Sequence, residues 1–148
     1  MDALPTVALE RRSGLQYKVD FAPGMAALYT DATPPLGQAK GPDSEMLLMA
    51  AVGNCLAASL AFSLDKYKNE SVNIKAVVGG AISQNDQGRL RMHSITVDIG
   101  LGAAASSLRF LQRALEQYED FCVVTQSVRA AIPVTVRVFD SDGVLLTA

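Results

Sequence analysis

Apolar and polar residues alternate with a period of two in the N-terminal third of the chain. Residues 7–9 and 15–21 follow this pattern, with a Ser-Gly pair between the two runs. Such alternation is typical of half-buried strands, so we expect an antiparallel hairpin here. A third short strand is expected over residues 27–30. The proline- and glycine-rich stretch 33–42 then predicts a loop that cannot be helical.

The apolar stretch from Ser44 to Lys66 predicts one long helix, with Asp43 or Ser44 as its N-cap. Apolar residues surround this helix almost completely, whereas a surface helix carries a single apolar stripe. One layer of sheet covers only one face. We therefore expect the other face to pack on a second long helix, on a second subunit, or on both.

The same helix approaches the length of a membrane span, because residues 46–64 carry no formal charge. Asn54, Ser59 and Ser63 interrupt the run, and its alanines lower its transfer energy. The rest of the chain supplies amphipathic strands that need an apolar cover. We therefore expect a core helix of a soluble protein and no membrane partner.

The second half of the chain predicts further strands and helices. Alternation over residues 72–78 runs up to a Gly-Gly pair, a polar turn follows at 84–88, and a strand returns over 89–101. The apolar parity shifts within the return strand, which predicts a bulge near His93 and Ser94. Later elements are an amphipathic helix over 104–118, a helical turn through Arg129, and strands over 132–138 and 144–146.

Composition limits the classes of partner and compartment. The net charge is −2, from 13 basic and 15 acidic residues spread along the 148-residue chain. No basic patch is present, so nucleic acid is not an expected partner. The first 20 residues contain charges and no apolar signal core, which favours the cytoplasm. The length fits one domain, residues 1–148.

Two cysteines, Cys55 and Cys122, lie 67 residues apart. Free cysteines are usually inert core residues. A disulfide between this pair in the cytoplasm would be transient. With the lone His93 they fall short of four zinc ligands, and the Gly-Gly pair lacks a dinucleotide motif, so we expect no metal and no bound cofactor.

Two segments resemble the OsmC/Ohr family of thiol-dependent peroxidases. GPDSEMLLMAAVGNC (41–55) is similar to that family's Gly-x-x-Pro-x-Glu-Leu-Leu-x-Ala-x-x-x-Cys signature, and FCVVTQSV (121–128) is similar to its second-cysteine segment. The resemblance covers nearly the whole chain and is clearest from residue 41 onward. It implies an α+β, OsmC-like fold in which antiparallel sheets wrap around long central helices in an intertwined homodimer.

The resemblance also implies a chemistry. Cys55 would be the peroxidatic thiol, oxidised to a sulfenic acid by an organic hydroperoxide, and Cys122 the resolving thiol that condenses with it to a disulfide. Surrounding leucines and methionines would favour a hydroperoxide with an apolar tail. The disulfide would be reduced by an external dithiol of the lipoyl or thioredoxin type.

The activating charges depart from the family's pattern. Peroxidatic members carry an arginine on an early strand, and the best local match here is Gln16. Arg11 and Arg12 are then displaced candidates, and Lys18 is a substitute. The position of the family glutamate, which helps to hold that arginine, is taken by Glu45.

Glu45 and Cys55 are ten residues apart, about 15 Å on one unbroken helix, so they cannot touch within it. Either an arginine bridges them, or the helix breaks early, or the relevant Glu45 belongs to a facing subunit. The alternative is a first-turn acid that stabilises the helix dipole.

A competing function follows from the missing arginine. The chain would then be a non-enzymatic OsmC-like protein that binds an apolar small molecule or acts in a stress response, with inert buried cysteines. Thr125 and Ser127, which follow Cys122, are able to hydrogen-bond a sulfur or cap a helical turn, and the cap is the favoured interpretation.

Overall fold

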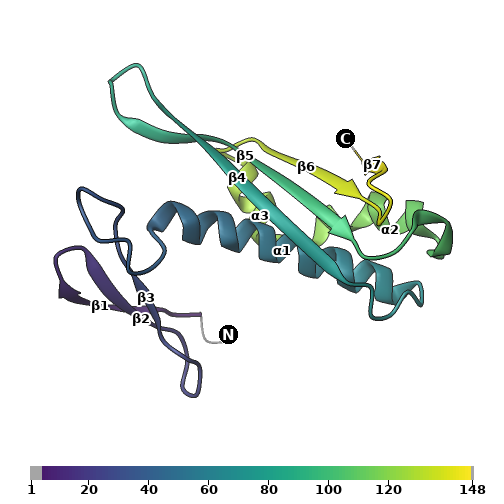
Figure 1. Cartoon of the computed structure of the whole chain (residues 1–148), viewed down its shortest axis with the longest axis horizontal. Helices are drawn as coiled ribbons and strands as arrows, with labels where there is room; N and C mark the ends of the chain where they lie inside the picture. The colour runs from purple at the N-terminus through teal and green to yellow at the C-terminus, as the bar shows by residue number, and fades with distance from the viewer. Residues whose placement is uncertain (1–4, 148) are drawn as a thin grey trace. The chain divides into compact units, whose positions relative to one another are not determined.

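The computed structural model describes residues 5–147 of the chain (Figure 1). The chain packs as two compact units, Met1–Leu48 and Met49–Ala148. A division by packing does not show that either unit folds alone, so the single domain expected from the length stays a prediction.

The first unit contains a three-stranded antiparallel sheet, in the order β1-β2-β3. Its strands are β1 (Ala8–Ser13), β2 (Gln16–Asp20) and β3 (Leu28–Thr30). The turn between β1 and β2 contains Gly14 at a φ of 55°, a left-handed conformation that favours glycine. The predicted hairpin and the predicted third strand are both confirmed.

The loop after β3 is organised by the buried carboxylate of Asp31. It accepts backbone N–H groups of Ala32, Gln38 and Lys40 at 2.8, 3.1 and 3.1 Å, and the Gln16 side-chain amide at 3.4 Å. The N–H of Lys40 is the largest influence that lowers the pKa of this carboxyl below its usual value, and those of Gln38 and Ala32 and the Gln16 amide add to it against the opposing effect of burial. One side chain therefore fixes a loop that has no regular structure of its own.

Helix α1 (Ser44–Lys66) has the bounds that the sequence predicts. Asp43 is its N-cap, because its Oδ1 accepts the N–H of Met46 at 2.8 Å. Helix α1 is also long and apolar enough to cross a membrane, judged by length and composition alone. In its most apolar 18-residue window, 33% of the residues are buried inside the protein. Core helices of soluble proteins meet the same two criteria, so this finding carries little weight.

The second unit is built on a four-stranded sheet, in the order β4-β5-β6-β7. Its strands are β4 (Ile74–Gln84), β5 (Leu90–Leu101), β6 (Val134–Phe139) and β7 (Leu145–Thr147). Three elements of the expected fold, the α+β class, the long hairpin and the bulge, are confirmed; the bulge lies where Ala81 pairs with Ser94 and Ile82 with Met92. The expectation that all strand pairs are antiparallel is corrected, since β5 and β6 run parallel, joined by a helical crossover.

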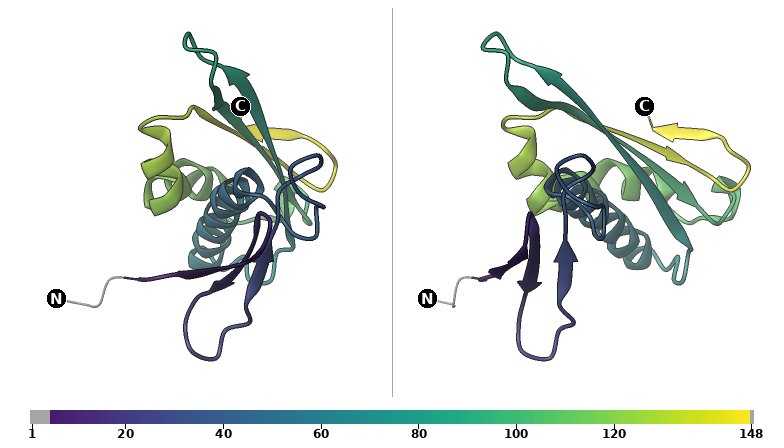
Figure 2. Two further views of the ribbon diagram at one scale, coloured as in Figure 1. Left: turned by 90° about the vertical axis from the view of Figure 1, so that its left-hand side faces the viewer. Right: turned by 60° about the vertical axis from the view of Figure 1, so that its left-hand side comes forward.

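Helices cover one face of this sheet (Figures 1 and 2). The side chains of the core come from α1, β5, β6 and the crossover helices, and most are less than 4% exposed. The aliphatic members from α1 and the sheet are Val52, Leu56, Leu60, Leu64, Ile95, Val97, Ile99, Leu101, Val134, Val136 and Val138. The core therefore fixes the α1 segment that carries Cys55 against the sheet.

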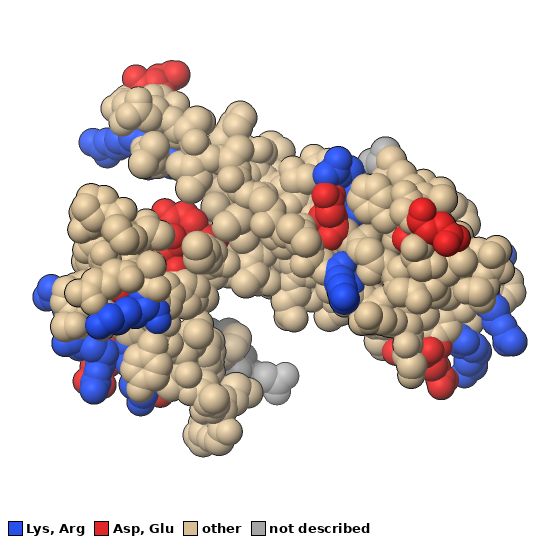
Figure 3. All heavy atoms as spheres, viewed as in Figure 1, with Lys and Arg blue, Asp and Glu red and all other residues tan. Residues whose placement is uncertain are grey.

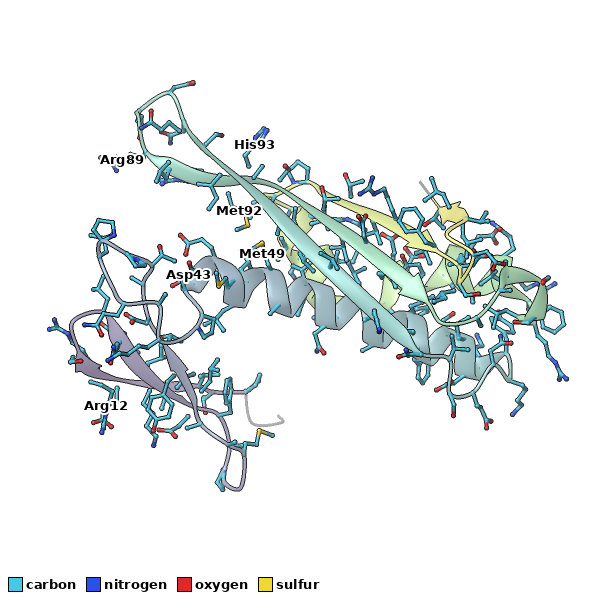
Figure 4. All side chains as sticks on the ribbon, viewed as in Figure 1. Arg12, Asp43, Met49, Arg89, Met92 and His93 are labelled. Atoms are coloured by element: carbon cyan, nitrogen blue, oxygen red, sulfur yellow. The ribbon has the colours of Figure 1, made fainter. Side chains whose placement is uncertain are left out.

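The Gly79-Gly80 pair lies inside β4 rather than at its end, so the strand is longer than its alternation predicts. A β-carbon on Gly80 would lie 2.9 Å from the sulfur of Met49 and 3.2 Å from the terminal carbon of Met92. Both methionine side chains point into the space between α1 and β5, whereas His93 points to the other side (Figure 4). Glycine at this position makes room for the two thioethers.

The amphipathic helix predicted over residues 104–118 is wrong in its first half. The crossover instead contains a 3₁₀ turn η1 (Ala105–Ser107), α2 (Leu111–Gln117), a second 3₁₀ turn η2 (Tyr118–Phe121) and α3 (Val123–Arg129). The side chain of Asn69 hydrogen-bonds both backbone groups of Arg109. Its Nδ2 donates to the Arg109 carbonyl, and its Oδ1 accepts the Arg109 N–H, each at 2.8 Å. Phe110 then adopts a φ of 50°, so a helix cannot run through this position.

Candidate active site

Cys55 and Cys122 come together in the second unit, although 67 residues separate them. Cys55 lies in the middle of α1 and is half-buried, and Cys122 lies between η2 and α3 and is fully buried. The two thiols are close enough that each affects the pKa of the other. Both sulfurs are free.

The surroundings favour the thiolate at Cys55. Burial alone would raise the pKa of this thiol, but the Cys122 thiol, the backbone N–H groups of Val124 and Thr125, and the Ser59 hydroxyl act in the opposite direction. The pKa of Cys55 therefore lies below its ordinary value of 9.0. The donors belong to the segment after Cys122 and to the next turn of α1.

The surroundings favour the protonated thiol at Cys122. Burial is the first cause that raises its pKa, and the neighbouring Cys55 adds to it, whereas Thr125 acts in the opposite direction. A hydrogen bond of 2.9 Å joins Cys122 Sγ to Thr125 Oγ1. The two pKa values are thus shifted in opposite directions, down at Cys55 and up at Cys122.

An apolar pocket of about 400 Å³ lies one helical turn beyond Cys55. Ser59, which contacts Cys55, is part of its wall. Phe62 and Phe121 line it while remaining 75% and 77% exposed, and Lys66 supplies a cation at its edge. The pocket is suited to a small molecule with an apolar body.

Glu45 lies in the first turn of α1, where it is exposed. The helix is unbroken between Glu45 and Cys55, so an early break as the route to contact is wrong. The bridging arginine and the facing subunit stay predictions. In the first unit Glu45 lines a pocket of about 330 Å³ that also contains Tyr17, Asp31 and Asp43.

Arg11 and Arg12 lie on the exposed strand β1 and have partners close in sequence. Arg11 Nε donates to the carbonyl oxygen of Gly14 at 2.8 Å, and Arg12 pairs with Glu10 at 3.2 Å. Lys18 pairs with Asp20 at 2.9 Å. The activating role expected for these cations stays a prediction.

The remaining candidates do not form a metal site. His93 is exposed on β5, and among residues 5–147 no group of three or more metal-ligating side chains occurs. Acidic and basic side chains are interspersed on the face shown in Figure 3. This distribution agrees with the charge pattern of the sequence.

Two side chains lie beside the sulfurs, Ser59 and Thr125; no role was predicted for Ser59, and a bond to sulfur was the less favoured of two interpretations for Thr125. Ser59 is four residues after Cys55, a spacing that places both on one helix face, so this signal was present. The cap favoured for Thr125 is wrong, because its hydroxyl bonds the Cys122 sulfur. The Ser127 hydroxyl, in contrast, donates to the carbonyl of Val123 at 2.8 Å.

Known proteins share both sequence features and the fold. The family model of OsmC-like proteins matches residues 37–137, and a search of curated proteins gives no match. Solved structures with the same fold include a putative osmotic stress induced and detoxification response protein from Psychrobacter arcticus, which is 14% identical with a TM-score of 0.78, covering 93% of this chain and 98% of that one.

Two further structures carry more specific names. The organic hydroperoxide resistance protein OsmC of Legionella pneumophila is 14% identical with a TM-score of 0.69, covering 93% of this chain and 98% of its own. The organic hydroperoxide resistance protein OhrB of Bacillus subtilis is 16% identical with a TM-score of 0.66, covering 92% and 99%. At these identities the likeness shows the fold.

Proposed function

Because the chain belongs to the OsmC-like protein family, we propose that it is a thiol-dependent peroxidase that reduces organic hydroperoxides through Cys55 and Cys122. The observation that carries the proposal is the proximity of two thiols whose pKa values shift in opposite directions, down at Cys55 and up at Cys122. The names of the Legionella and Bacillus structures support the substrate class.

The reaction starts at the Cys55 thiolate. Its sulfur attacks the distal oxygen of the hydroperoxide, the O–O bond breaks, and an alcohol leaves while Cys55 becomes a sulfenic acid. Cys122 then attacks the oxidised sulfur, which forms the disulfide and releases water. An external dithiol, of the lipoyl or thioredoxin type, returns both thiols, so the cycle needs no bound cofactor.

The donors around Cys55 reduce the demand for a neighbouring cation. Backbone N–H groups and a hydroxyl favour the thiolate, which supports thiolate chemistry at Cys55 with Gln16 at the position of the family's arginine. Gln16 instead donates to Asp31 and supports the loop that precedes α1. Glu45, Arg11 and Arg12 would then contribute to substrate attack in addition to this local activation.

Mass spectrometry of the intact protein after treatment with cumene hydroperoxide tests the proposal. The wild-type chain should lose two hydrogens as the disulfide forms, and Cys122→Ser should gain one oxygen at Cys55. Cys55→Ser is the matched control and should show neither change. If the folded wild-type protein shows no modification, the peroxidase function is refuted.

The apolar pocket favours a second candidate function, the binding of an apolar small molecule without turnover. Its walls contain Ala58, Phe62 and Phe121, and it lies beside a cysteine rather than around it. The rate of Cys55 alkylation against pH separates the two functions. An apparent pKa below the unperturbed thiol supports catalysis, and one above it supports an inert pair.

We also propose that the chain forms a homodimer. Several large apolar side chains of the second unit are exposed, including Phe62, Val77, Phe121 and Val123 at 73–77%. A second copy is the partner that would cover them by symmetric contact. One chain has a mass of 15.7 kDa, and analytical ultracentrifugation should give twice this mass. A monomer at micromolar concentration would refute the dimer.

A further inference from the structure

Thr125 is a buried polar residue with an unusual partner. Its side chain is 0% exposed, and its Oγ1 lies 2.9 Å from Cys122 Sγ. A buried hydroxyl normally forms a hydrogen bond with a backbone group, because an unbonded hydroxyl in an apolar interior is costly in free energy. Here the bond is made to a thiol instead, three residues earlier in the chain.

The helix does not require this hydroxyl. The backbone of α3 begins with the N–H of Gln126 bonded to the carbonyl of Cys122 at 2.9 Å, and the side chain of Cys122, the N-cap residue, makes no capping hydrogen bond. Ser127, two residues further on, bonds the backbone carbonyl of Val123. Thr125 and Ser127 therefore provide two hydroxyls in one short helix, of which only the first touches sulfur.

We propose that Thr125 is a positioning residue for the resolving step, and that its hydroxyl holds the Cys122 sulfur toward Cys55 so that attack follows oxidation quickly. This role rests on the proposed function, in which an organic hydroperoxide is the oxidant. Thr125 touches neither peroxide nor alcohol in that scheme. It acts through Cys122.

The step that it assists is balanced as follows. The S–H bond of Cys122 and the S–O bond of the Cys55 sulfenic acid break, and the S–S bond forms. The proton from Cys122 and the hydroxyl from Cys55 leave together as one water. As the Cys122 sulfur loses its proton, the Thr125 hydroxyl is placed to donate to it, and a hydrogen bond to a charged sulfur is stronger than one to a neutral thiol.

A peroxide-free reaction isolates this step. The aromatic disulfide DTNB reacts first with Cys55 and releases one coloured thiolate. Cys122 then attacks the mixed disulfide on Cys55 and releases a second. We expect Thr125→Val to slow the second release about tenfold, equivalent to about 1.4 kcal/mol of activation free energy, with the first release within a factor of two of wild type.

Two variants control for structural effects. Thr125→Ser keeps the hydroxyl and should restore the second release to near the wild-type rate. Ser127→Ala removes the neighbouring hydroxyl from the same helix and should change neither release. Circular dichroism and the melting temperature show whether each variant is folded.

The outcomes are decisive for Thr125. A second release at the wild-type rate in folded Thr125→Val refutes the positioning role, as does an equal slowing of both releases, or a Thr125→Ser variant as slow as Thr125→Val. If wild-type protein leaves hydroperoxide unreduced but shows both DTNB releases, the proposed function fails and the exchange rates alone decide the role of Thr125. If wild type lacks a second release, Cys122 does not reach Cys55 and the positioning role fails too.

Discussion

Oxidation of the cysteine pair should stabilise the folded chain strongly. A Cys55–Cys122 bond closes a loop of 67 residues, and constraining that loop in the unfolded chain costs about 15 cal/mol/K, or about 4.4 kcal/mol at 25 °C. The two thiols already lie near each other in the reduced structure, so we expect little of this gain to be lost to native-state distortion. We expect a gain of about 4 kcal/mol in the free energy of unfolding.

The comparison is made between reduced protein and protein oxidised with diamide, at one protein concentration. At 2–4 °C per kcal/mol for a chain of about this size, the melting temperature should rise by roughly 10 °C on oxidation. Cys122→Ser, treated identically, should not shift. By linkage, folding stabilises the disulfide relative to the two thiols by the same free energy. This corresponds to a reduction potential of the pair about 90 mV lower in the folded chain than in the unfolded chain.

An unchanged or lower melting temperature in fully oxidised protein would refute this reasoning. It would mean that the sulfurs bond only after the native backbone moves, at a cost comparable with the entropic gain. Oxidation is scored by the loss of two hydrogens in the intact mass, so incomplete reaction is not mistaken for a failed prediction.

Three further predictions concern individual side chains. Ser59→Ala removes a donor that lowers the pKa of Cys55, so its pH profile of alkylation should move to higher pH, whereas Ser63→Ala, whose hydroxyl donates to the carbonyl of Ala114, should leave it unchanged. Asn69→Ala leaves both backbone groups of Arg109 without their partner and should lower the free energy of unfolding by about 2–3 kcal/mol in a urea titration. The folded pKa of Asp31 lies below its unfolded value near 3.8, so its contribution to stability is complete above that pH and is lost as the pH falls below it; urea titrations at successive pH values should show a weaker acid dependence in Asp31→Asn.

The sequence predicts elements well where the local pattern and the packing agree. The α1 helix has its expected first and last residues because an N-cap acid, a continuous apolar run and a charged last turn all act locally. The bulge in β5 is visible as a change of parity. Both features depend on residues close together in the chain.

Prediction fails where a distant side chain decides the local conformation. Residues 104–110 have the apolar spacing of a helix, but Asn69, some 40 positions earlier, binds the backbone of Arg109 and excludes the helix there. The parallel pairing of β5 and β6 follows from the path of the crossover, which no local pattern specifies. Periodicity contains neither kind of information.

The candidate site shows the same division between local pattern and distant contacts. From the sequence, an apolar surrounding at Cys55 requires a cation or a strong donor to favour the thiolate, and the candidate cations were Arg11, Arg12 and Lys18. In the folded chain the segment after Cys122 brings two backbone N–H groups to the sulfur, and these groups exist whatever the side chains are. The segment around Cys122 therefore brings to Cys55 both a second thiol and part of the influence that lowers its pKa, which a search for side chains alone does not detect.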